Sequence, residues 1–411
     1  MRSDRRLAAI THCHSVQSNN RASPMDDLIR GAVERVTGEP ADAFDWSESL
    51  TTAAEIEQVL HGADGRPGVD LLFVTDHVNE TVRALDPDLV ALAVAEPRIA
   101  LGAEIQTVLE CPLGSGTWVE APEVLMYGSS DRVRSPGGWH YGLSAEVLDD
   151  IQATCRPAGA PRIELHRVLA YCRERRIAHA ISHPLEGHFV GLPQVLRAIS
   201  ACRFIEAVNG GYSGDSTRRL LRYIELHDRA TGGRPGGRGV AGHEPHLDDA
   251  HAIATWRGEH LGGTGSHVAD GIVPWGGSDA HLGRYDRVCM MYRPPAEVKN
   301  PGIPEMVRDM VETPAADLLR DRVFEIEGRG NGLTSVLREV LQLIVINARR
   351  NASTFRGPRR FARLLALAPY LATAEIVRGH RAQARLGTLL DDVLLRASQS
   401  PRRARSARAA A

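Results

Sequence analysis

Histidine and carboxylate residues follow several short apolar runs of the 411-residue chain, and these residue types are common metal ligands. The first example is "THCHS", in which His12 and His14 stand two residues apart after the apolar run "LAAI". If this segment is a strand, both side chains point to one face, because strand side chains alternate with a period of two. Similar residues follow later apolar runs: Asp76 and His77, Glu104, His183, Glu206 and Asn209, and Asp279 and His281.

Each of these short motifs has a structural explanation when it is taken alone. An HxH pair arises by chance, Asp and Ser commonly cap helices, and a histidine before proline can simply end a strand. The complete set favours a metal site, because burying so many ionisable groups together is costly without a cation. Imidazole and carboxylate ligands together suit zinc, manganese and iron.

The elements that must position these residues alternate between short apolar runs and helical patterns. Strands are predicted at 7–11, 69–75, 98–102, 177–182, 204–208 and 272–276. Helices are predicted at 51–61, 80–93, 145–154, 164–175, 191–200 and 215–228. Continuous apolar runs are typical of strands buried on both faces, so the alternation predicts an α/β fold, either a barrel or a doubly wound sheet. In both, functional residues gather at the carboxyl ends of the strands.

Three segments depart from this alternation. Residues 107–128 read as a β-hairpin, and the Gly/Pro-rich residues 230–245 read as a loop near the site or a mobile lid. Amphipathic, Arg-rich patterns predict a helical appendage at 331–398 after a catalytic domain at 1–330. The final residues, 399–411, are expected to be a disordered tail.

Charge, cysteine spacing and the length of apolar runs argue against several classes of protein. The net charge is only −2, but residues 349–411 hold 14 Arg and three acidic residues, so residues 1–348 carry about −13. An acidic main body argues against nucleic-acid binding. The six cysteines are scattered without a CxxC spacing, which favours free thiols. No apolar run is long enough for a signal peptide or a membrane span, so the sequence predicts a cytoplasmic protein.

The ordered set "HCHS", "TDH", "GAE", "SHP", "IEAVNG" and "GSDAH" resembles the PHP (polymerase and histidinol phosphatase) superfamily of metal-dependent phosphoesterases. The resemblance covers about residues 7–330. It implies a distorted seven-stranded (β/α) barrel with a cluster of two or three divalent metal ions at its C-terminal mouth, and zinc, manganese and iron are the expected metals.

The resemblance also implies a ligand set. One metal would be held by His12, His14, Glu104 and Asp279. A second would be held by Glu104 and His183, and a third by His77 and His281. Asp76, His183 and His281 are the candidate catalytic residues for proton transfer.

Two positions differ from the family pattern. Asn19 stands where the family usually has Asp or His, and an amide oxygen is a weaker, neutral ligand. Glu123 stands near the place of a metal-binding histidine, and its carboxylate could also bind a cation. These differences bear on the third metal more than on the first two.

The function that follows is hydrolysis of a small phosphorylated molecule by a metal-activated water. Asn209, His188 and Arg284 are the candidate substrate-binding residues, since Arg can pair with phosphate in a bidentate manner. Three alternatives remain open: a metal-dependent ester or amide hydrolase of PHP type, a nuclease, and an interaction protein. In the last case, residues 349–411 would dock on an acidic partner or an anionic membrane surface.

Overall fold

The computed structural model describes residues 5–15, 18, 31, 34–35, 38, 52–62, 67–78, 86–110, 114–184, 201–210, 217–218, 220–221, 224, 271–279, 288–328, 342, 345 and 349. The predicted loop at 230–245, the tail at 399–411 and nearly all of the appendage at 331–398 lie outside these residues. So do the surfaces that were expected to bind an acidic partner or a membrane. In the part of the chain that is described, no helix is long and apolar enough to cross a membrane.

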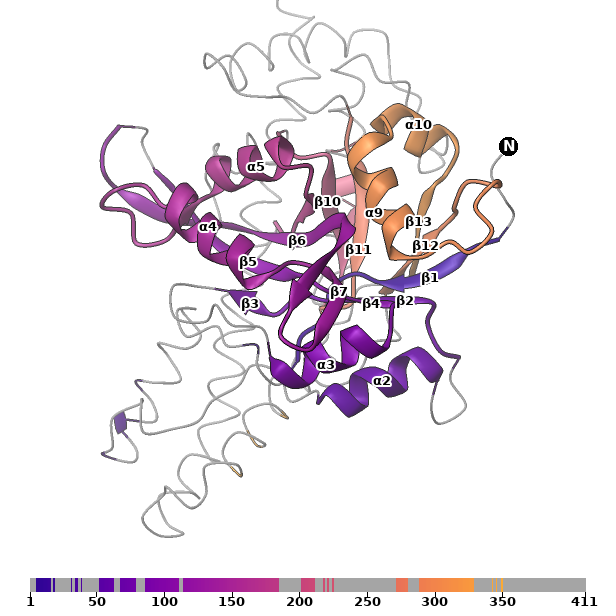
Figure 1. Cartoon of the computed structure of the whole chain (residues 1–411). Coiled ribbons are helices and arrows are strands. Elements are labelled where there is room, and N and C mark those ends of the chain that lie inside the picture. Colours follow the sequence, from indigo (N-terminus) through magenta and orange to yellow (C-terminus); the bar gives the residue numbers. More distant parts are fainter. Residues whose placement is uncertain are drawn as a thin grey trace, which may run out of the picture.

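The described strands form one mixed sheet whose main path contains ten strands (Figure 1). The path runs through β11 (Val273–Gly277), β10 (Phe204–Asn209), β9 (Ala178–Ile181), β6 (Trp118–Ser135), β7 (Gly138–Gly142), β4 (Ile99–Leu101), β2 (Leu71–Val74), β1 (Leu7–Ile10), β12 (Val288–Tyr292) and β13 (Phe324–Gly328). Three strands lie off the path: β3 (His77–Val78), β5 (Ala103–Glu110) and β8 (Ile163–Glu164).

The two ends of this path approach each other, so the sheet is a nearly closed barrel. A Cβ atom on Gly276 of β11 would lie 2.8 Å from Ile326 of β13 and 3.0 Å from Val288 of β12. The hydroxyl of Thr11, just after β1, also donates to the carbonyl of Gly276 at 2.6 Å. The α/β class and the barrel shape are therefore as predicted.

The predicted seven-stranded (β/α) barrel is wrong in its strand count and its connections. The predicted hairpin exists, because β5 and β6 are antiparallel, and β6 continues to pair with β7 and β9. A second antiparallel pair, β12 with β13, extends the sheet beyond β1. The β5–β6 and β6–β7 hairpins join their strands without an intervening helix, so the barrel mixes parallel and antiparallel pairs.

Three buried clusters show how the layers pack. Inward-facing side chains from around the path, among them Phe73, Tyr127 and Trp275, form one core with helix α9 (Ile303–Glu312) and helix α10 (Ala315–Arg320). Helices α2 (Ala53–His61) and α3 (Pro87–Ala95) cover the outer faces of β1, β2 and β4. Helices α4 (Ala145–Cys155) and α5 (Leu165–Glu174) cover β5, β6 and β9.

Local sequence signals explain where several helices begin. Thr52 and Glu55 form a capping box at the start of α2, and Ser144 caps α4. Asp86 caps α3 and Pro87 occupies its first turn, so this helix begins later than the predicted start at residue 80. The five described cysteines form no disulfide, in agreement with the prediction of free thiols.

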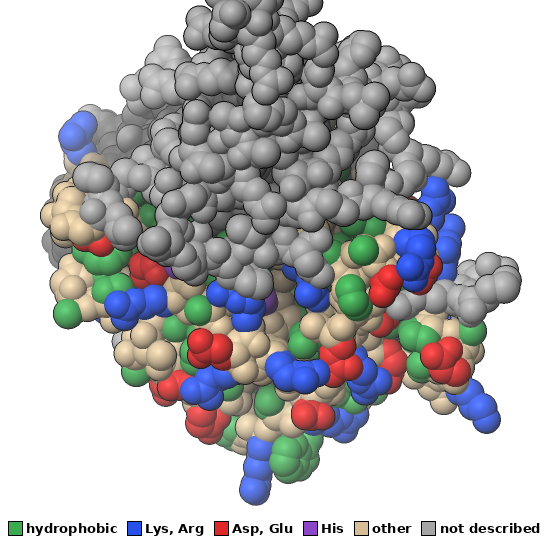
Figure 2. All heavy atoms as spheres, turned by 90° about the horizontal axis from the view of Figure 1, so that it is seen from above, with side chains coloured by type: hydrophobic (Ala, Val, Ile, Leu, Met, Phe, Trp, Pro, Cys, Tyr) green, Lys and Arg blue, Asp and Glu red, His purple; other side chains and the backbone are tan. Residues whose placement is uncertain are grey.

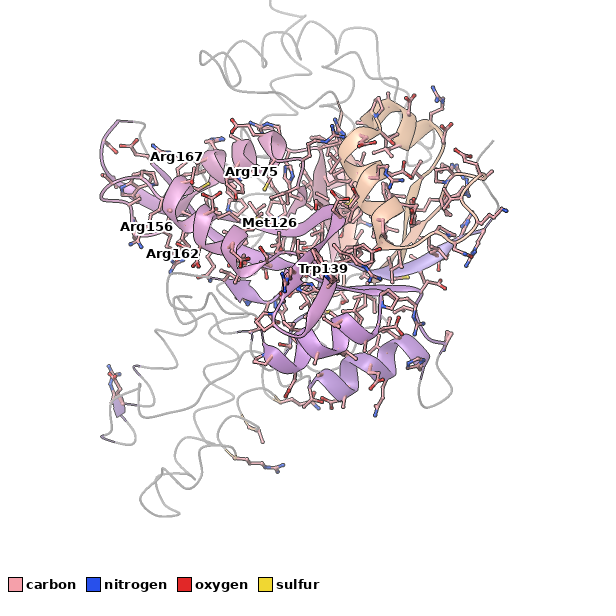
Figure 3. The ribbon with its side chains drawn as sticks, in the orientation of Figure 1. Met126, Trp139, Arg156, Arg162, Arg167 and Arg175 are labelled. Atoms are coloured by element: carbon pink, nitrogen blue, oxygen red, sulfur yellow. The ribbon has the colours of Figure 1, made fainter. Side chains whose placement is uncertain are left out.

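The described surface carries charges of both signs. Figure 2 shows Lys and Arg side chains interspersed with Asp and Glu side chains on one face. Figure 3 labels four arginines on or beside helices α4 and α5: Arg156, Arg162, Arg167 and Arg175. Arg175 pairs with Asp150 at 2.8 Å, and Arg162 lies 3.7 Å from Glu120. Two of these four arginines therefore have acidic neighbours.

Candidate metal centre

The candidate site lies where neighbouring parallel strands end at one rim of the barrel. The parallel pairs β1–β2, β2–β4 and β10–β11 bring the segments after β1, β2, β4 and β11 together, with Glu206 and Asn209 inside β10. Backbone bonds continue past the strand ends, since Asp279 N–H donates to the carbonyl of His12 at 3.0 Å. Glu104 N–H similarly donates to the carbonyl of Asp76 at 3.0 Å.

Four side chains converge on one small volume: His12, His14, Glu104 and Asp279. His12 Nε2 lies 3.1 Å from His14 Nε2, 3.1 Å from Glu104 Oε2 and 3.5 Å from Asp279 Oδ1. His14 Nε2 lies 3.3 Å from Glu104 Oε2 and 3.2 Å from Asp279 Oδ1. Ligand atoms around a tetrahedral zinc with bonds of about 2.0–2.1 Å lie about 3.3–3.4 Å apart. The spacing therefore fits a shared cation.

The carboxylate of Glu104 faces two groups of ligands. Its Oε2 lies 3.0 Å from His77 Nε2, in addition to the contacts with His12 and His14. Its Oε1 lies 3.0 Å from His183 Nε2, yet this buried oxygen accepts no hydrogen bond from the described residues. A short N–O distance without hydrogen-bond geometry fits two lone pairs that face a common cation. Among the described residues, three overlapping groups could hold a metal ion: His12–Glu104–His183, His12–His14–Asp279 and His14–His77–Glu104.

Burial and nearby charges shift the pKa values of His12 and Glu104 in opposite directions. Burial by itself would lower the pKa of His12, but the nearby charges of Glu104, Glu206 and Asp279 raise it well above its usual value. Burial would raise the pKa of Glu104, but His12, His77 and His183 hold it well below its usual range. Without a cation, these groups therefore bind each other as ion pairs.

Two serines form further polar contacts around the candidate ligands, Ser18 with two histidines and Ser15 with Asp76. The hydroxyl of Ser18 lies 3.0 Å from His14 Nδ1 and 2.9 Å from His77 Nδ1. The backbone N–H and hydroxyl of Ser15 donate to Asp76 at 2.6 and 2.5 Å. Burial raises the pKa of Asp76 to about 6, although its hydrogen bonds from Ser15 oppose this shift.

The structure also locates two residues whose sequence assignment was indirect. Glu123 Oε2 lies 3.5 Å from His183 Nε2 and 3.9 Å from His77 Nε2, so this carboxylate borders the site. Asn209 donates through Nδ2 to Glu206 at 2.9 Å and to Asp279 at 3.3 Å. Asn209 thus belongs to the polar network around the ligands, and its assignment to substrate binding remains a prediction.

The remaining assigned residues lie outside the described part of the chain: Asn19, His188, His281 and Arg284. Two described residues of the site had no role in the sequence analysis, Ser15 and Ser18, and Glu206 had only a place at a strand end. The serines lie next to the HxH motif, but nothing in their spacing indicates which ring nitrogen they contact. No family model, curated protein or solved structure matches the chain.

Proposed function

We propose that this chain is a metal-dependent hydrolase of the PHP type, and specifically a phosphoesterase that acts on a small phosphorylated substrate. The observation that supports this most strongly is the convergence of His12, His14, Glu104 and Asp279, in which each histidine Nε2 lies 3.1–3.5 Å from the facing ligand atoms. Two or three divalent cations of zinc, manganese or iron are the proposed cofactors. When bound, they would lower the pKa of a water molecule and neutralise charge on phosphoryl oxygens.

The position of Glu104 is an argument for more than one cation. Its two oxygens face different histidines, with His12, His14 and His77 near Oε2 and His183 near Oε1. A carboxylate that faces ligands on both sides is suited to bridge two cations. Paired cations in phosphatases and nucleases lie about 3.5–4 Å apart and hold the attacking and leaving oxygens. This arrangement fits phosphoester chemistry, and it favours a metal-dependent hydrolase over an interaction protein.

Exposure indicates the side from which a substrate would arrive. The side chains of His12, His14 and Glu104 are fully buried, whereas that of Asp279 is 13% exposed. A phosphate group would therefore approach the ligands from the Asp279 side. Asp76, with its pKa near 6, is suited to exchange protons close to neutral pH.

Metal analysis of the purified protein tests the proposal. Wild type should contain bound transition metal, and the variant His12→Ala plus His14→Ala should lose it. A matched control replaces two histidines outside the site, His61→Ala plus His166→Ala, and should retain the metal. Equal metal content in wild type and the His12/His14 variant would contradict the proposal.

Substrates then separate the proposed reaction from its alternatives. Metal-loaded wild type should hydrolyse p-nitrophenyl phosphate or bis-p-nitrophenyl phosphate, and the His12/His14 variant should not. Hydrolysis of p-nitrophenyl acetate alone, lost in the same variant, would instead identify a carboxylic ester hydrolase. Activity that survives removal of all metal would exclude both.

A further inference from the structure

Glu206 is a fully buried carboxylate of β10 that lies directly behind the candidate ligands. We propose that Glu206 is a positioning residue that holds His12 in its metal-binding tautomer and links three ligand-bearing segments of the barrel. This inference rests on the proposed function, because it concerns the same metal centre. It assigns a role that neither the motif spacing nor the ligand distances define.

The first argument is the contact between Glu206 and His12. Glu206 Oε1 lies 2.9 Å from His12 Nδ1. A carboxylate only accepts hydrogen bonds, so Nδ1 must carry the proton that is shared between them. In the neutral imidazole, Nε2 then presents a lone pair, and this atom faces His14 and Glu104. A carboxylate behind a ligating histidine is a common way to fix its tautomer and ring orientation.

The second argument is the set of donors at the other oxygen. Glu206 Oε2 accepts from the backbone N–H of His183 at 2.9 Å and from Asn209 Nδ2 at 2.9 Å. The hydroxyl of Ser182 lies 3.3 Å from the same oxygen. Asn209 Nδ2 also lies 3.3 Å from Asp279 Oδ2. Glu206 therefore connects the segments that carry His12, His183 and Asp279.

The third argument is the close packing at Gly277. A Cβ atom at this position would overlap Glu206 Oε1 and lie 2.7 Å from the Cβ of His12. Only glycine leaves room for β11 to pass beside the Glu206–His12 pair. The contact thus depends on three strands that approach closely, and a substitution at Gly277 should disturb it without removing either partner.

Glu206 is better placed to support ligands than to act as one. Both of its oxygens are already occupied by the donors of His12, His183 and Asn209. Among the described residues, the groups that could hold a metal include His12 and Asp279 but not Glu206. Its effect on a cation therefore passes through other residues.

Zinc affinity of the Glu206→Gln variant tests this role. A glutamine places an NH₂ group against either His12 or the donors at Oε2, so either the Nδ1-protonated tautomer of His12 or the contacts with His183 and Asn209 must be lost. We expect zinc to bind about 10–100-fold more weakly, as measured by competition with a chromophoric chelator. The control Asp309→Asn alters another buried carboxylate, which accepts from Tyr292 and Thr313, and should lower stability while zinc affinity stays unchanged.

Gly277→Ala provides a second test that retains Glu206. This variant should also weaken zinc binding, whereas Gly276→Ala, which would press on Ile326 and Val288 in the barrel wall, should not. If Glu206→Gln and Gly277→Ala both bind zinc as tightly as wild type, the inference is wrong.

The tautomer of His12 can be read in the wild-type protein. Nitrogen-15 NMR of histidine-labelled protein should show His12 protonated at Nδ1, with its signal assigned by its loss in His12→Ala. Protonation at Nε2 alone would overturn the inference. If wild type binds no metal, the proposed function fails, but the spectrum of the metal-free protein, recorded at a pH where His12 is neutral, still tests the Glu206–His12 contact.

Discussion

The imidazole rings of His14 and His77 stack in parallel, with ring centroids 4.5 Å apart and planes 6° apart. Ser18 touches Nδ1 of both rings through its hydroxyl and accepts from the backbone N–H of His77 at 3.1 Å. The Nε2 atoms of both rings consequently face the same oxygen of Glu104, at 3.3 and 3.0 Å. One buried hydroxyl thus contacts two candidate ligands that are 63 residues apart in sequence.

Ser18→Ala should weaken metal binding without unfolding the protein. The two rings would lose a shared contact on the side opposite to their candidate metal-binding atoms, so we expect an affinity loss of about tenfold. Chelator competition measures this loss. Ser144→Ala is a suitable control because it removes the N-cap of α4, which should cost about 1 kcal/mol of stability and leave metal affinity unchanged.

Glu104→Gln should remove at least one equivalent of bound metal. The amide is neutral and cannot replace a carboxylate whose two oxygens face histidines on both sides. We expect the proposed phosphatase activity to fall by at least about 100-fold, with metal content measured on the same sample. Glu120→Gln changes a carboxylate beside Arg162, away from the site, and should retain both metal and activity. Full metal content in Glu104→Gln would contradict a bridging role.

Removal of the metal should destabilise the protein more at high pH than at low pH. The raised pKa of His12 stabilises the metal-free protein below its unfolded pKa of about 6.5, and this contribution is lost as pH rises through the folded pKa. A cation must displace that proton, so its affinity increases with pH. The difference in melting temperature with and without EDTA should grow from pH 6 to pH 8. The His12/His14 variant should show no such difference, and a pH-independent difference in wild type would refute the expectation.

His179 should contribute a separate loss of stability in acid. Burial lowers its pKa to about 4, helped by Arg173 and Arg203, although the hydrogen bond from Nδ1 to the carbonyl of Ile177 opposes the shift. A lowered pKa means that the stabilisation is complete above pH 6.5 and disappears as pH falls toward 4. Because the side chain is only partly buried, we expect about 1–2 kcal/mol.

Denaturant unfolding of wild type and His179→Gln at pH 7.5 and pH 4.5 measures this contribution. Wild type should lose more stability than the variant between the two values. Equal losses would show that His179 does not titrate as described. The comparison of the two proteins cancels the titration of the candidate metal site, whose residues both proteins retain.

Local pattern was sufficient to locate the strands that carry the candidate site. Each of six predicted ranges overlaps an observed strand, β1, β2, β4, β9, β10 and β11, because continuous apolar runs mark strands that are covered on both faces. The HxH motif also behaves as expected, with His12 and His14 directed into one volume. Strand ends and side-chain alternation are local properties, so a single sequence reveals them.

The strand count and the strand order depend on pairings that the sequence pattern does not show. The barrel has ten strands on its path because β6 lies between β7 and β9, and because β12 pairs with β1 and β13 with β12. β6 and β7 are adjacent in the chain, but β9 is distant from β6 and β12 is distant from β1, and these pairings depend on cross-strand packing that no single segment encodes.

The sequence by itself determined which residue types stand at the barrel rim and in what order, because these follow from apolar runs and the residues that end them. Only the tertiary structure decided which atoms meet. His12 and Glu206 are 194 residues apart, and His14 and Asp279 are 265 apart, yet each pair is within 3.2 Å. Strand twist, register and the absence of a side chain at Gly277 set these distances, and all three depend on how remote segments pack.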